Sequence, residues 1–261
     1  MIRYSIFLLL IFLPLHAFED DDIDGVENSK DLCPDTSFDK TVGENGCPEN
    51  ENYLGELTLI LGSDFNFDDT TTTDYTFFSN YKYNKWDLSL YNSAQSSLDN
   101  NNNEIQSTGD LYLSSGYSIS QENLYTKLTF GIKIPTGSSE VSTEEEDYFA
   151  SININYPLNE NFVLFSSLSY TLTGDNNETT YNNPLGYSVG IGYMVNDNWY
   201  SSLGYQQSNS IYKDGEDYQS VSLFNSYNFT DNFFGTLNYT KGIDELSYDQ
   251  TVSLRLGVTF E

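Results

Sequence analysis

The stretch that decides the fold is Tyr148–Thr173, with the sequence YFASININYPLNENFVLFSSLSYTLT. In its first half, Tyr148, Ala150, Ile152, Ile154 and Tyr156 lie on one face, and Phe149, Ser151, Asn153 and Asn155 lie on the other. After a break at 158–161, a similar alternation resumes. Because side chains on a strand point to opposite faces with period two, this stretch predicts an antiparallel hairpin with one apolar and one polar side.

Both predicted strands are longer than an average strand, and aromatic residues lie near their ends. A long strand that is apolar between aromatic ends and polar on its other face is typical of an outer-membrane barrel, where lipid lies outside and water inside. The same unit recurs along the chain. We therefore expect an all-β, antiparallel up-and-down transmembrane β-barrel over residues 53–261.

Twelve such segments follow one another, an even number as expected of a single-chain bacterial barrel. They are residues 53–62, 74–83, 85–93, 109–119, 123–134, 147–157, 161–173, 185–195, 198–207, 218–229, 232–241 and 250–260. Short turns between them alternate without exception with long, polar and acidic connections. The long connections are residues 63–73, 94–108, 135–146, 174–184, 208–217 and 242–249. This pattern predicts extracellular loops, periplasmic turns and both barrel ends in the periplasm; a soluble sandwich or solenoid is the alternative fold.

Residues 1–17 predict a signal peptide, with Arg3 in the positive region, an apolar run at 6–13 and Leu15-His16-Ala17 before cleavage. The run is too short to span a bilayer as a helix. Cleavage would remove the only histidine, which disfavours a hydrolase with a histidine base. It would also leave 9 basic against 39 acidic residues, because Arg3 is one of the 10 Lys and Arg. Such a charge disfavours a nucleic-acid partner. The missing histidine, together with Asp and Glu pairs that lie in loops and not in a converging pocket, predicts a protein that is not an enzyme.

Residues 18–52 form a separate acidic segment with a candidate cation loop at Asp20–Asp31. Carboxylates stand at loop positions 1, 3, 5 and 12, glycine at 6, a carbonyl at 7 and an amide oxygen at 9, a spacing that wraps a loop around a hard cation. An EF-hand would end on Glu, where this loop has Asp31. A solvated acidic linker is the alternative. Two cysteines in an exported chain predict a disulfide.

This loop, followed by Leu32-Cys33-Pro34-Asp35 and Gly46-Cys47-Pro48, resembles a thrombospondin type 3 calcium repeat over about thirty residues. The resemblance implies calcium as the cofactor and a disulfide between Cys33 and Cys47. It also implies six ligands, Asp20, Asp22, Asp24, Val26, Asn28 and Asp31. Asn28 departs from the aspartate common at its position.

The alternation also divides the barrel wall into a lipid face and a lumen face. If Leu128, Phe130, Ile132, Ile154, Leu168, Val189, Ile191, Leu254 and Leu256 face lipid, their neighbours face inward. Candidate lumen residues are then Glu56, Lys82, Asp87, Lys127, Lys133 and Arg255. This predicts a small, polar and mildly cationic wall beneath acidic loops that include Asp64 and Asp147. The basic side chains could neutralise lumen carboxylates or contact a solute.

Two further stretches resemble known barrels. The segment Phe130–Gly137, FGIKIPTG, resembles the strand-end motif of an outer-membrane barrel family associated with the meta pathway of phenol degradation, which implies passage or binding of small, partly hydrophobic compounds. The terminal residues 251–261 resemble a barrel assembly signal, with Glu261 after the usual terminal aromatic.

Together these patterns predict a passive channel or small-solute transporter in the outer membrane of a Gram-negative bacterium, with a periplasmic N-terminal segment. Its partners would be outer-membrane lipid, calcium ions and a small solute. Two alternatives remain, a non-conducting structural barrel whose acidic loops bind divalent cations, and a secreted calcium-dependent β-protein.

Overall fold

The computed structural model divides into two compact units, Met1–Tyr53 and Leu54–Glu261. It describes residues 22, 25–28, 30–33, 36, 42–47, 55–68, 71–98, 104–121, 123–138, 145–175, 180–213, 215–244 and 247–260. The predicted signal peptide, residues 1–17, lies outside these residues, as do Asp20 and Asp24. None of the described residues forms a helix long and apolar enough to cross a membrane.

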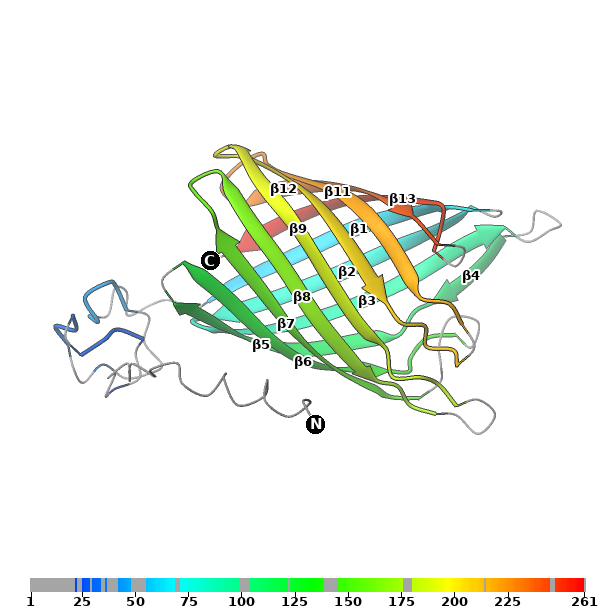
Figure 1. Ribbon diagram of the computed structural model, residues 1–261, viewed down its shortest axis with the longest axis horizontal. Coiled ribbons are helices and arrows are strands. Elements are labelled where there is room, and N and C mark those ends of the chain that lie inside the picture. The colour runs from blue at the N-terminus through cyan, green and yellow to red at the C-terminus, as the bar shows by residue number, and fades with distance from the viewer. Residues whose placement is uncertain are drawn as a thin grey trace, which may run out of the picture. The chain divides into compact units, whose positions relative to one another are not determined.

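The second unit is built from antiparallel strands that tilt across the molecule (Figure 1). In chain order they are β1 (Glu56–Phe67), β2 (Thr72–Tyr83), β3 (Trp86–Leu98), β4 (Glu104–Thr108), β5 (Leu111–Gln121), β6 (Leu124–Ile134), β7 (Asp147–Pro157), β8 (Phe162–Leu172), β9 (Leu185–Asn196), β10 (Trp199–Ser208), β11 (Tyr218–Asn228), β12 (Phe233–Gly242) and β13 (Gln250–Phe260).

Each strand pairs with its sequence neighbours, and the last strand pairs with the first, so the sheet closes on itself. β4 and β5 together occupy the place of one strand in the barrel wall. β4 pairs with the C-terminal part of β3, residues 94–98, and β5 pairs with its N-terminal part, residues 86–91. The prediction of a twelve-stranded antiparallel barrel is therefore confirmed. Closure removes the unpaired edges that an open sheet would expose.

The two ends of the barrel differ in their connections. At one end, called here the turn end, the strands are joined through residues 84–85, 122–123, 158–161, 197–198 and 229–232. Asn84 adopts a positive φ of 53°, which suits a two-residue hairpin. The first and last strands also meet at the turn end, where Leu57 lies opposite Phe260. The opposite end, called the loop end, carries the longer connections.

The predicted alternation of long and short connections is wrong for the first two. β1 continues to Phe67 and β3 to Leu98, so these connections shrink to residues 68–71 and 99–103. Polar side chains bond across the extended strands; for example, the Asn66 amide donates to Asp74 at 2.8 Å. These hydrogen bonds allow the ladder to extend through a polar sequence that has loop-like composition. The other four long connections lie close to their predicted positions.

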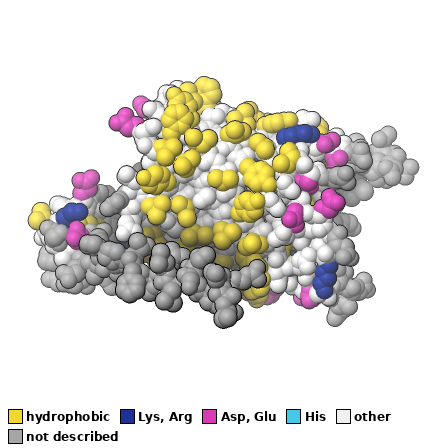
Figure 2. Space-filling model, viewed as in Figure 1, with side chains coloured by type: hydrophobic (Ala, Val, Ile, Leu, Met, Phe, Trp, Pro, Cys, Tyr) yellow, Lys and Arg dark blue, Asp and Glu magenta, His cyan; other side chains and the backbone are white. Residues whose placement is uncertain are grey.

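The outer face of the barrel is apolar between two aromatic belts, as an outer-membrane wall requires. Exposed aliphatic and aromatic side chains fill the middle of the wall in Figure 2. Aromatic residues near the turn end are Tyr81, Trp86, Tyr156, Phe162, Tyr193, Trp199, Tyr227 and Phe233, and those near the loop end are Tyr75, Tyr148, Tyr170, Tyr187 and Tyr239. All nine predicted lipid-facing residues lie on this outer face.

The first unit is held by a disulfide and hydrogen bonds. The Cys33–Cys47 disulfide joins Cα atoms 5.1 Å apart. The backbone N–H of Leu32 donates to the carbonyl of Asn45 at 2.8 Å, and the buried Thr36 hydroxyl lies 2.9 Å from the Gly46 carbonyl. No hydrophobic side chain among the described residues is fully buried. The cross-link therefore takes the place that a core would have in a larger domain.

Candidate functional site

The inner face of the barrel is the candidate functional site, and all six predicted lumen residues lie on it. Their positions follow from the register, in which Glu56 lies opposite Lys82, Lys82 opposite Asp87, and Asp87 opposite Gly116. Farther around the wall, Ser118 lies opposite Lys127, Tyr112 opposite Lys133, and Thr236 opposite Arg255.

Lys133 occupies a buried anionic pocket near the loop end. Its Nζ lies 2.7 Å from an oxygen of Asp147 and 3.7 Å from an oxygen of Asp110, and the side chains of Lys133 and Asp110 are each only 4% exposed. The other oxygen of Asp110 accepts the Gly137 N–H, and that of Asp147 accepts the Gly174 N–H, each at 2.9 Å. One cluster thus fastens the bases of two loops to the wall.

Two further ion pairs cross the inner face. Lys127 Nζ lies 2.8 Å from Asp87, whose side chain is 8% exposed. The Arg255 guanidinium donates to both oxygens of Asp64 at 3.0 and 3.1 Å. Asp74, directly opposite Asp64, accepts instead from Asn66 and from Gln95 at 2.9 Å.

The prediction of a mildly cationic lumen is wrong. Asp64 lies in β1 and not in a loop, Asp147 begins β7, and both face inward with Asp74. Composition placed Asp64 in a loop because β1 runs farther than the apolar pattern does, whereas Asp147 is the first residue of the predicted strand 147–157. Lys127, Lys133 and Arg255 are each paired with a carboxylate, which supports the neutralising interpretation of these basic groups.

Three inward phenylalanine rings lie against the wall. Phe149 covers Gly131, Phe165 covers Gly190, and Phe234 covers Gly257, each on the neighbouring strand. A Cβ added at any of these glycines would approach ring atoms to less than 3.0 Å. Glycine is therefore needed at these positions for the three rings to lie flat.

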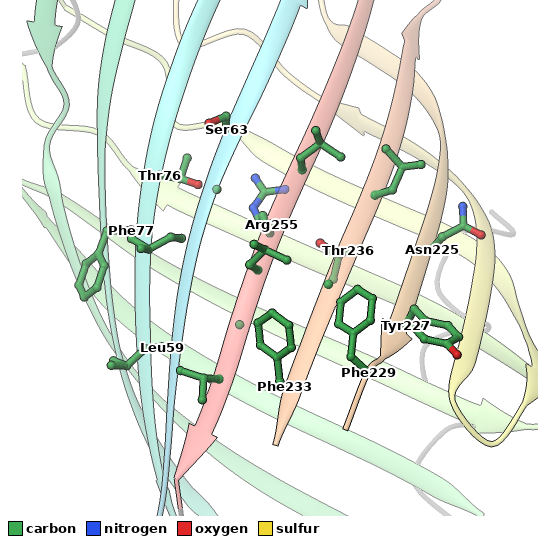
Figure 3. A pocket seen from close by; sticks show the side chains of 18 of the residues that line it. Leu59, Ser63, Thr76, Phe77, Asn225, Tyr227, Phe229, Phe233, Thr236 and Arg255 are labelled. Carbon is green, nitrogen blue, oxygen red and sulfur yellow. The ribbon is translucent and has the colours of Figure 1, made fainter. Parts of the chain in front are cut away.

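One cavity, of about 1100 Å³, lies on the outer face across β1, β2, β11, β12 and β13 (Figure 3). Leu59 and Phe77 line it on one side, and the rings of Phe229 and Phe233, 5.2 Å apart, on the other. Gly235 and Ser63 have small side chains among these larger ones, so the outer surface is hollowed there. Its outer side chains are mainly apolar and belong to the lipid-facing belt, so this cavity is part of the membrane contact surface.

A second cavity, of about 290 Å³, lies on β8, β9, β10 and β11 toward the loop end. Six serines line it, Ser167, Ser169, Ser188, Ser208, Ser220 and Ser247. Sequence analysis missed this site, because isolated serines on alternating positions are the ordinary content of a lumen wall. Only the three-dimensional register brings them together.

The structure describes four of the six predicted calcium ligands, Asp22, Val26, Asn28 and Asp31. One oxygen of Asp22 accepts the Thr36 N–H and one of Asp31 accepts the Cys33 N–H, each at 2.7 Å. The other oxygen of each carboxylate is buried without a hydrogen-bond partner. No group of three or more His, Cys, Asp or Glu side chains suited to a metal occurs among the residues that can be placed.

Comparison with known proteins agrees with this geometry. The model of the family described as "Putative MetA-pathway of phenol degradation" matches residues 52–260. The chain belongs to this family. No curated protein matches the chain.

Two solved structures resemble this chain in fold. An outer membrane channel of Pseudomonas putida F1 is 13% identical, covers 81% of this chain and 99% of its own, and gives a TM-score of 0.66. The NanC porin is 11% identical, covers 78% and 99%, and gives a TM-score of 0.54. At these identities the likeness shows the fold alone, which is that of an outer-membrane β-barrel. In this chain, the FGIKIPTG motif contains Lys133 and Gly137, which belong to the buried cluster around Asp110 and Asp147.

Proposed function

We propose that this barrel is a passive channel or transporter for small solutes in the outer membrane of a Gram-negative bacterium. The observation that carries the proposal is the inner face, where aromatic rings lie against glycines and the remaining inward side chains are mostly small and polar. Such a wall leaves room for water and solute inside a barrel of this strand number. We assign no catalytic activity to the chain.

Family membership and the likeness to an outer membrane channel support the same proposal. The turn end would face the periplasm, because the short turns of such barrels are periplasmic and the longer loops extracellular. Strand β1 begins at the turn end, so the segment that precedes it in the chain would be periplasmic.

We expect the refolded chain to form discrete conducting steps in a planar bilayer, with a preference for cations. Among the described strand residues, inward carboxylates outnumber inward cations: the carboxylates are Glu56, Asp64, Asp74, Asp87 and Asp147, and the cations are Lys82, Lys127, Lys133 and Arg255. The reversal potential in a KCl gradient measures this preference. Lys82→Gln, which removes an exposed lumen cation, should strengthen it, whereas Lys213→Gln in a loop serves as the matched control. A heat-modifiable, inserted barrel without current would instead favour the non-conducting structural barrel.

We further propose that the N-terminal unit binds calcium through the Asp20–Asp31 loop. The buried, unpartnered oxygens of Asp22 and Asp31 support the proposal, because a buried carboxylate oxygen without a donor is costly unless a cation or water satisfies it. Their partner oxygens accept backbone N–H groups, which orients both carboxylates. Asp20, Asp24, Asn28 and the Val26 carbonyl would complete the oxygen set.

Asp22→Asn and Asp31→Asn should each weaken calcium binding by about tenfold or more, since affinity in oxygen sites follows the number of charged ligands. Calorimetric titration of the full chain with calcium measures the dissociation constant. Glu44→Gln, an exposed acid of the same unit, is the control and should leave that constant unchanged. Equal affinity in all three variants would support the solvated acidic linker.

A further inference from the structure

The serine-lined cavity, defined above by Ser167, Ser169, Ser188, Ser208, Ser220 and Ser247, has the features of a solute subsite. Gly186 and the inward Gln206 add a bare backbone and a primary amide to its wall, and the remaining lining residues are Tyr187, Gln207, Tyr218 and Gln219. Its volume of about 290 Å³ lies near the lower end of small-molecule sites, roughly 300–1,000 Å³. Ser247 comes from the connection between β12 and β13, so a loop closes the cavity toward the loop end.

Among the described residues, no Asp, Glu, Lys or Arg lines this cavity. Two acids that bond to residues of its wall are held by hydrogen bonds: Asp244 accepts the backbone N–H groups of Gln219 and Ser247, and Asp217 accepts the side-chain amides of Gln207 and Asn209. The described wall therefore has no cation that could balance a bound anion, and the carboxylates of Asp244 and Asp217 already accept hydrogen bonds from the protein. The chemistry of the wall favours an uncharged ligand.

Ser220 is the residue that points to a ligand. Its side chain is 4% exposed, faces inward opposite Gln206, and its Oγ is buried without a hydrogen-bond partner. By contrast, the Oγ atoms of Ser167 and Ser188 lie 2.7 Å apart and satisfy each other. Burying an unpaired hydroxyl costs free energy that a hydroxylated ligand would recover.

We propose that this cavity is a subsite for small, uncharged, polyhydroxylated solutes, with the Ser220 hydroxyl as one of its hydrogen-bonding groups. The inference rests on the proposed channel function and names the chemistry of its solute. Hydroxyls and amides donate and accept at once, so they match a ligand whose surface is covered with hydroxyls. A phenol offers one hydroxyl beside an apolar ring, so it would form fewer hydrogen bonds with this wall than a polyhydroxylated solute.

The proposal is tested by binding, independently of conduction. The full chain, refolded in an amine-oxide detergent that carries no sugar, is titrated with D-glucose, gluconate, glucosamine and phenol, and saturation-transfer NMR follows each ligand. Glucose should bind saturably and more tightly than the other three. Ser220→Ala should weaken glucose binding about three- to tenfold, the loss expected for one hydrogen bond. Ser222→Ala, the next inward serine on β11 and outside the cavity, is the matched control and should bind as the wild type does.

A second variant, Gln206→Leu, adds bulk and removes an amide at an exposed lumen position that tolerates substitution, and should also weaken glucose binding. Glucose binding that is equal in wild type, Ser220→Ala and Gln206→Leu would overturn the proposal. So would saturable binding of phenol or gluconate without that of glucose. Bilayer recordings made in parallel distinguish failure of the subsite from failure of the channel. If the wild type binds glucose and Ser220→Ala does not, while the inserted wild type carries no current, the channel is refuted and the subsite stands.

Discussion

Replacing Lys133 with Met is expected to lower the free energy of unfolding by about 3–5 kcal/mol, the usual cost of breaking a buried ion pair from one side. Lys133 Nζ lies between Asp147 and Asp110, and its side chain is 4% exposed. Met has a similar volume but no charge. The substitution would therefore leave the carboxylates of Asp110 and Asp147 close together without the cation that lies between them, and burial limits how far water can solvate them.

Urea unfolding of the barrel in vesicles, followed by tryptophan fluorescence and by heat-modifiable migration, measures this loss. Lys241→Met is the matched control, because the Lys241–Asp249 pair is exposed at 47% and 70% and spans 3.4 Å. Such a surface pair contributes at most about 1 kcal/mol. Adding Asp110→Asn and Asp147→Asn to Lys133→Met should recover part of the stability. Equal losses for Lys133→Met and Lys241→Met would show that the buried cluster does not hold the loop bases.

Replacing Cys33 and Cys47 with Ser should abolish calcium binding while leaving the barrel intact. The disulfide closes a sequence separation of 14 residues, and in the chain-entropy model a loop of this size contributes roughly 3 kcal/mol. No described hydrophobic side chain is fully buried, so little else in this unit can replace that contribution. Asp22 and Asp31 are oriented by the N–H groups of Thr36 and Cys33, next to the cross-link, and would lose their geometry with it.

Calcium titration of the double variant, beside the oxidised and the reduced wild type, checks this expectation. Reduction with dithiothreitol should reproduce the variant, which separates loss of the cross-link from the effect of the new serines. Heat-modifiable migration of the barrel serves as the internal control and should not change. Calcium affinity that survives both treatments would mean that the loop folds without the cross-link.

The strand pattern and the direction of each side chain could be predicted from the sequence because both follow from local alternation. The bounds of 147–157 and 250–260 match the structure, and Lys127, Lys133 and Arg255 face inward. The polar extensions of β1 to β3 could not be predicted, since they depend on cross-strand hydrogen bonds between side chains and not on apolar periodicity. Strand β4 likewise lies within the predicted connection 94–108, and Gly109 and Asp110, which begin the predicted strand 109–119, separate it from β5.

The contacts made by the site residues were harder to predict from the sequence than the directions of their side chains. The sequence identifies Lys133 as a lumen cation but cannot say that Asp110 and Asp147 enclose it, because those contacts join three segments of the chain. The same holds for the serine-lined cavity, whose residues come from four strands and one connection. By contrast, the Cys33–Cys47 pairing that the calcium-repeat resemblance implies is present in the structure.

The inward rings of Phe149, Phe165 and Phe234, each resting on a glycine of the next strand, have a consequence for how barrels of this kind diversify. Strand number sets the diameter of the backbone cylinder, but the free bore depends on whether each ring lies flat or projects. A single methyl group at Gly131, Gly190 or Gly257 would force the ring away from the wall. Two barrels with the same strands and the same aromatic content could therefore differ in calibre through the placement of a few glycines.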